Sequence, residues 1–145
     1  MGLEKICVSK ETAIRLFEAG VVIEYPIAMW VSDDNMQWQC VFTEGYNWSD
    51  FPCYSGFKYQ YPAPSGDEIE KFITKDYTDR DVYFVCEFLN NRIRIDCGVD
   101  NLFYYQNKQS YDNKADAMAE IAFWFVELQL HLNGLSFKKN GHDPQ

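Results

Sequence analysis

The residue types best suited to catalysis and metal binding are scarce in this chain. Its two histidines, His131 and His142, each lack a second ligand at the spacing that zinc sites use. Five cysteines are spread along the sequence, at Cys7, Cys40, Cys53, Cys86 and Cys97. No two of them form a Cys-x-x-Cys motif, and no nucleophile motif surrounds any of them. We therefore expect no catalytic residue, no bound metal and no cofactor.

Acidic residues are the next candidates for chemistry. Asp76, Asp79 and Asp81 cluster before one apolar segment, and Asp96 lies in the next. Paired carboxylates can serve as acid and base or hold a divalent ion. The spacing lacks the glycine and glutamate of a calcium loop, and no glycine-rich nucleotide motif is present. The favoured interpretation is a solvated acidic loop, partly neutralised by Arg80.

Aromatic side chains are the other unusual feature, at 17% of the 145 residues. They are dense between positions 46 and 61, where they could pave a covered sheet or form an exposed patch for a protein or small molecule. Alternation places Phe57, Tyr59 and Tyr61 on one sheet face, which favours the core. The candidate interaction surface of the exposed alternative combines aromatic and acidic residues: Trp48, Phe51, Tyr54, Asp76, Asp79 and Asp81.

The net charge limits the classes of partner that the chain can bind. The chain has 22 acidic and 13 basic residues, a net charge of −9, and no lysine or arginine cluster. Such a surface repels nucleic acid and anionic membrane. No apolar run approaches the length of a membrane span, and the first residues lack the apolar core of a signal peptide. Because scattered, odd-numbered cysteines are typical of a reducing compartment, we expect a cytoplasmic protein with an unknown protein partner.

Hydrophobic periodicity predicts the elements that must position these residues. Ser9 can cap a first helix that Gly20 ends. Ser65 and Glu68 form the capping box of a second, short helix. The elements expected in this half are the helix over 10–19, strands over 21–31, 38–42 and 57–61, and the helix over 66–73.

The clearest hairpin lies in the second half of the chain. Val82–Leu89 reads as its first strand, and alternation around Ile93 indicates the return strand. Asn90 and Asn91 suit the two-residue turn between them, because asparagine tolerates positive φ. A further strand is expected over 102–105.

The last helix carries the longest apolar stripe. Asp112 or Asn113 can cap its start, whereas Asn133 and Gly134 threaten to end it early. The stripe could cover the sheet of its own chain, which we favour together with a monomer, or it could form a homodimer seam. Its residues are Met118, Ile121, Phe125, Leu128, Leu132 and Leu135.

These elements predict an α+β fold, with an antiparallel sheet of about five to six strands and helices packed on one face. Hydrophobic residues make up 47% of the chain, which is enough to bury a core. The fold is expected to form a single domain over residues 1–137, followed by a flexible polar tail over 138–145.

Four segments follow an order that can be compared with known proteins: 9–20, 62–73, 83–97 and 114–132, with Tyr111 and Asp112 ahead of the last. This order resembles small prophage-encoded hypothetical proteins of gut bacteria. The Trp-Leu-Arg motif of that group is absent, because Lys71, Phe72 and Ile73 occupy its place. The resemblance implies no activity, since those proteins have none assigned.

Two functional hypotheses remain open. The first is a non-enzymatic phage or mobile-element accessory protein that acts through protein–protein contact. The second is a small-molecule-binding protein or enzyme that places its acidic cluster beside an aromatic groove. A pocket that joins rings and carboxylates favours the second hypothesis, and a convex, fully packed surface favours the first.

Overall fold

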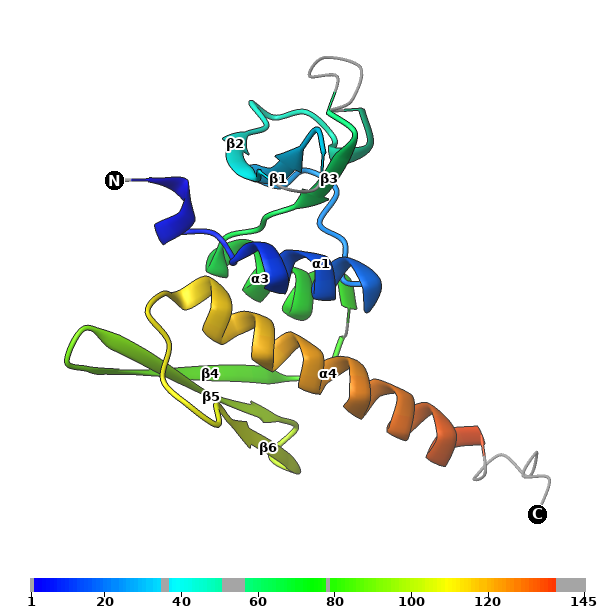
Figure 1. The fold of residues 1–145 in the computed structure, drawn as a ribbon. Helices are drawn as coiled ribbons and strands as arrows, with labels where there is room; N and C mark the ends of the chain where they lie inside the picture. The colour runs from blue at the N-terminus through cyan, green and yellow to red at the C-terminus, as the bar shows by residue number, and fades with distance from the viewer. Residues whose placement is uncertain (1, 35–36, 51–56, 78, 138–145) are drawn as a thin grey trace.

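The structure is a computed structural model that describes residues 2–34, 37–50, 57–77 and 79–137 (Figure 1). Its helical elements are η1 (Leu3–Lys5), α1 (Lys10–Glu18), η2 (Trp48–Asp50), α3 (Gly66–Lys71), the π-helical η3 (Phe72–Tyr77) and α4 (Lys114–Phe137). Its strands are β1 (Ala28–Ser32), β2 (Gln39–Phe42), β3 (Tyr59–Pro62), β4 (Val82–Leu89), β5 (Arg92–Val99) and β6 (Phe103–Gln106). The expected tail over 138–145 lies outside the described residues.

The strands form two antiparallel sheets of three strands each, in the orders β2-β1-β3 and β4-β5-β6. The α+β class is therefore confirmed, but the prediction of one sheet was wrong. The chain leaves the first sheet at β3 and passes through α3 and η3 before it begins β4. Figure 1 shows that this passage carries the chain across the helices, so β4 starts a new sheet on their other side.

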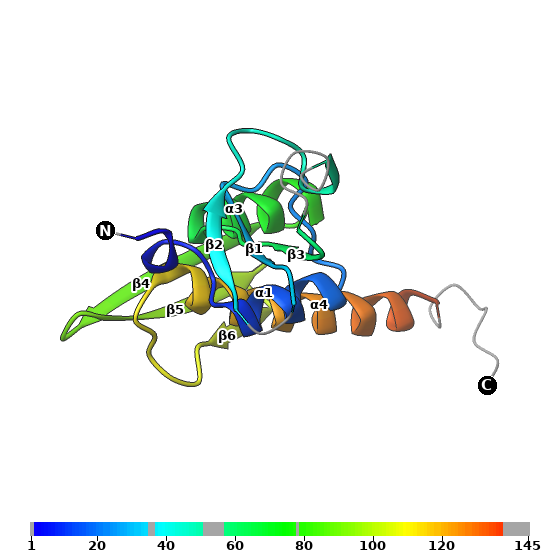
Figure 2. The same ribbon diagram turned by 45° about the horizontal axis from the view of Figure 1, so that its top comes forward.

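The helices lie between the two sheets (Figures 1 and 2). α1 packs against β3 and α4, α3 packs against α4, and α4 packs against β5 and β6. The main core fills these contacts with fully buried side chains that include Leu16, Ile69, Ile95, Met118 and Phe125. Both sheets therefore share one helical layer.

The local signals at the ends of these elements are confirmed. The Ser9 hydroxyl accepts a hydrogen bond from the Thr12 amide at 3.4 Å, at the start of α1. Ser65 and Glu68 form the predicted capping box of α3. Asn90 and Asn91 hold the β4–β5 turn with φ angles of 51° and 67°. Each signal depends on residues close in sequence, which explains why it can be identified without the fold.

α4 uses most of its apolar stripe inside the chain. Asn113 caps the helix by accepting a hydrogen bond from the Asp116 amide at 2.8 Å. The helix continues through Asn133 and Gly134 to Phe137, so the expected early stop does not occur. Within the stripe, Met118, Ile121 and Phe125 are buried in the core and Leu128 packs against it, whereas the side chains of Leu132 and Leu135 are not among those described. The three buried residues are not available to a second copy.

No helix in the described part of the chain, α4 included, has the length and apolarity that crossing a membrane requires.

Candidate interaction surface

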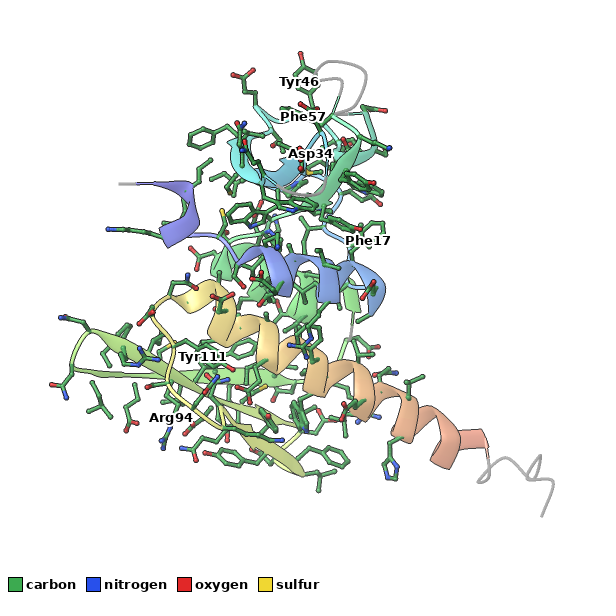
Figure 3. The ribbon with its side chains drawn as sticks, viewed as in Figure 1. Phe17, Asp34, Tyr46, Phe57, Arg94 and Tyr111 are labelled. Atoms are coloured by element: carbon green, nitrogen blue, oxygen red, sulfur yellow. The ribbon has the colours of Figure 1, made fainter. Side chains whose placement is uncertain are left out.

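The second sheet has one covered and one uncovered face. Along β5, residues alternate between the two faces, and Ile93, Ile95 and Cys97 are buried on the face toward α4. Arg92 and Arg94 occupy the opposite face. Figure 3 shows Tyr111 on the helix side of the hairpin and Arg94 on the other side. Because α4 packs on β5 and β6, the third strand, β4, lies at the rim of this cover.

The uncovered face carries large apolar side chains where a solvated sheet would carry polar ones. Register places residues 83, 85 and 89 of β4 on this face, together with residue 104 of β6. We define the outer apolar face by these residues and one in the adjacent β5–β6 turn: Tyr83, Val85, Leu89, Leu102 and Tyr104. Their exposed fractions lie between 48% and 77%. Clustered apolar exposure of this kind marks interaction sites, whereas single exposed residues do not.

The two tyrosines of this face are held in place by the sheet. Tyr83 lies over Gly98, where a Cβ atom would overlap the tyrosine ring. Across the sheet, Tyr104 pairs in register with Gly98 and its hydroxyl hydrogen-bonds to Asp96, which raises the pKa of Tyr104. The missing side chain at Gly98 therefore lets an aromatic ring lie flat against the strand. A binding surface that is ordered before binding loses less entropy when it binds.

The β4–β5 hairpin extends past the first turn of α4 (Figures 1 and 2). Its β5 side is anchored at the tip, because Ile93 exchanges two backbone hydrogen bonds of 2.8 Å with Tyr111. Arg92 reinforces this anchor through Asp112, at 2.6 Å, and the carbonyl of Ser110, at 2.7 Å. Among the described residues, no comparable contact holds its β4 side. Phe88 is 73% exposed, although the register places it on the inner face.

Of the three predicted aromatic residues, the described one, Trp48, does not belong to this surface. Trp48 is partly buried, packs edge-on against Phe17 with ring centroids 5.1 Å apart, and contacts the small cluster of Met29 and Val31 under the first sheet. Phe51 and Tyr54 lie outside the described residues.

The predicted acidic residues lie at the start of β4. Asp79 and Asp81 are exposed, and the Asp81 amide donates to the carboxylate of Asp100 at 3.0 Å. Arg80 pairs with the same carboxylate at 2.6 Å. The backbone of Asp76 belongs to η3, but its side chain is not among those described. Within the described residues, no three His, Cys, Asp or Glu side chains gather as a metal site would need.

A groove of about 660 Å³ lies elsewhere, between α1, α4 and the segment after β6. Its central carboxylate, Glu120, accepts hydrogen bonds from the hydroxyls of Tyr105 and Tyr111, the latter at 2.6 Å. Burial, followed by these bonds, raises the pKa of both tyrosines. Trp124 stacks on Tyr105 with centroids 5.2 Å apart. Rings and a carboxylate thus do meet in a groove, but the carboxylate is not one of the predicted acids.

Sequence reasoning missed the outer apolar face, although β4 carried a signal for it. Its eight residues include one charge, Glu87, and apolar groups on both faces. That pattern is typical of a strand buried on both sides, and β4 is instead an edge strand. An edge strand with this composition is expected to contact something outside its own chain.

The four described cysteines carry thiols rather than disulfides. They differ in environment, because Cys7 and Cys97 are buried, whereas Cys86 is exposed on β4. Comparison of the whole chain with protein-family models, curated proteins and solved structures returned no significant match.

Proposed function

We propose that this chain is a non-enzymatic protein that acts by binding a partner protein through its outer apolar face. The observation that carries the proposal is the cluster of five exposed apolar side chains on a sheet face that no helix covers in the described part of the chain. The phage or mobile-element setting is part of the proposal and rests on the resemblance in the order of elements.

The size of the face supports binding. Five side chains that are half to three-quarters exposed present on the order of 400 Å² of apolar area, a patch of the size that is often functional on a monomer. Burying this area would contribute roughly 10 kcal/mol before the costs of association are subtracted.

The charge of the chain favours a partner protein that is basic. The outer face is interspersed with Glu87, Asp96 and Arg94, and Glu87 lies 4.0 Å from Arg94. Polar groups within the face orient a partner, while the apolar groups around them supply affinity. The chain as a whole has a net charge of −9, which attracts a basic protein and speeds its encounter.

The test compares three forms of the chain as bait in lysate of its native host. Leu89→Lys places a charge in the outer apolar face, and Phe42→Lys places the same charge on an exposed residue of the first sheet. A partner captured by the wild type is identified by mass spectrometry, purified and titrated against each form by calorimetry. We expect Leu89→Lys to weaken binding at least tenfold and Phe42→Lys to leave it unchanged. Equal affinity for all three forms would refute the proposal.

A second candidate function is small-molecule binding in the groove beside Glu120. The observation that favours it is the stacked pair of Tyr105 and Trp124 beside Glu120, in a groove that Asp116 and Glu127 also line. Rings with carboxylates nearby suit a planar cationic ligand. A ligand-observed NMR screen of aromatic amines tests it, with Trp124→Ala expected to abolish any saturation transfer that the wild type gives.

A further inference from the structure

β4 has one hydrogen-bonded side and one open side. All eight of its residues pair with β5, and no other described segment pairs with it. A β-turn bonds its first and fourth residues, so Leu89 and Arg92 form a hydrogen-bonded pair. Alternation then directs the backbone groups of Phe88, Cys86 and Phe84 to the open edge. These groups form a ready template for another strand.

Apart from the single charge of Glu87, the edge lacks the features that keep other edge strands from pairing. Proteins shorten edge strands, place lysine or proline in them, or bend them with bulges. β2, β3 and β6, the other edge strands, have four residues each, whereas β4 has eight. β4 contains no lysine and no proline, and its register with β5 is unbroken.

We infer that the occupant of this edge is a second copy of the chain, paired antiparallel through β4 to make one continuous six-stranded sheet. The inference goes beyond the proposed function, because it concerns the edge of the sheet. Only Leu89 and Tyr83 of the outer apolar face meet across this edge, and the face itself stays open to a partner. In the dimer the outer apolar faces of the two copies lie side by side.

Symmetry limits the register of this pairing. A two-fold axis perpendicular to the sheet relates the two β4 strands and keeps every side chain on its original face. The axis must therefore pass next to one residue of β4 that lies directly opposite the same residue in the other copy. The middle of β4 offers two such residues, Val85 and Cys86. An axis at Val85 places Leu89 against the carboxylate of Asp81. An axis at Cys86 instead places Leu89 against Tyr83, so Cys86 is the centre.

The register centred on Cys86 also covers the most exposed ring of the hairpin. It places each Phe88 opposite Phe84 of the other copy, which already packs against the core of its own chain. Cross-strand aromatic pairs of this kind stabilise sheets. Glu87, the one charge in β4, then lies opposite Val85, so no two like charges face each other directly.

The surface area that the β4 pairing would bury indicates a weak, reversible dimer. Pairing through β4 removes on the order of 500 Å² from each copy, which is near the lower end of specific interfaces. Two chains of charge −9 also repel each other. Dimerisation is therefore expected to depend on protein concentration and to strengthen when salt is raised from about 0.05 to about 0.5 M.

Sedimentation equilibrium across protein concentrations tests the inference. The wild type should shift from the monomer mass of 17.0 kDa toward twice that value. Phe88→Lys, at a residue that is 73% exposed, should raise the dissociation constant at least tenfold. Leu102→Lys, at a residue of similar exposure in the β5–β6 turn, should not. A wild type that stays at 17.0 kDa, or a dimer that Phe88→Lys does not weaken, overturns the inference.

Mild oxidation of the wild type gives an independent test, with Cys86→Ser as its control. Hydrogen-bonded residues facing each other across antiparallel strands have Cα atoms about 5.5 Å apart, within the range that a disulfide spans. Oxidised wild type should therefore form a covalent dimer whose linked peptides both contain Cys86, and Cys86→Ser should form none while still associating reversibly. A crosslink through another cysteine would place the contact elsewhere and reject this edge. Because Phe88→Lys leaves the outer apolar face intact, loss of the dimer with retained partner binding separates this inference from the proposed function.

Discussion

Asn107 ties the second sheet to α4 through its side chain, and replacing it tests how much this link contributes to stability. The residue is 3% exposed. Its side-chain oxygen accepts a hydrogen bond from the Ile95 amide at 2.8 Å, and its side-chain nitrogen donates to the Ala117 carbonyl at 3.1 Å. The Asn107 amide in turn donates to the Ile95 carbonyl at 3.0 Å. The Asn107 side chain thus acts as a hydrogen-bond partner for strand β5 and also links this strand to helix α4.

The change Asn107→Ala removes both side-chain bonds. The buried Ile95 amide is then left without an acceptor, which costs about 1–3 kcal/mol. The Ala117 carbonyl loses less, because it keeps its bond within the helix. Together with the small void that forms, we expect a loss of about 2–4 kcal/mol in the free energy of unfolding. With a urea dependence of about 2 kcal/mol per molar, the unfolding midpoint should fall by about 1–2 M.

Urea unfolding followed by tryptophan fluorescence measures this shift. Gln106→Ala is the control, since Gln106 is the exposed neighbour on β6 and its loss should change stability by no more than about 0.5 kcal/mol. A midpoint for Asn107→Ala within about 0.3 M of the wild type would refute the reasoning, because it would mean that water or a shift of the chain satisfies the buried amide.

Three further predictions concern the same half of the molecule. Burial and a hydrogen bond to a carboxylate of α4 raise the pKa of Tyr105, so its contribution to stability is present below the ordinary tyrosine pKa of about 10 and is lost as the pH rises through its folded pKa. Tyr105→Phe should therefore flatten the alkaline fall of stability in urea titrations above about pH 10, and an unchanged slope there would contradict this. Burial raises the pKa of Cys97 to about 12, so brief alkylation of the native protein should label the exposed Cys86 long before Cys97, and equal labelling by mass spectrometry would be the contrary result. Gly98→Ala should displace the half-exposed Tyr83 ring and cost no more than about 1 kcal/mol, and this cost should vanish in a Tyr83→Ala background when both are measured by thermal unfolding.

The sequence by itself determined the local features of the fold. The caps at Ser9 and Ser65, the turn at Asn90 and Asn91, and the full extent of β4 agree with the structure. Each depends on hydrogen bonds or backbone preferences within a few residues, so composition and spacing are enough to indicate it. The α+β class followed from the same signals.

The tertiary structure alone decided how the strands are divided and which surface stays open. No short sequence pattern encodes which distant strands pair. The sequence therefore could not show that β3 pairs with β1 or that β4 begins a second sheet. The apolar run of β4 would look the same in a buried central strand and in an exposed edge strand. Only the position of α4, over β5 and β6, distinguishes the two cases. Among the described residues, no helix packs on the outer apolar face and no second strand pairs with β4.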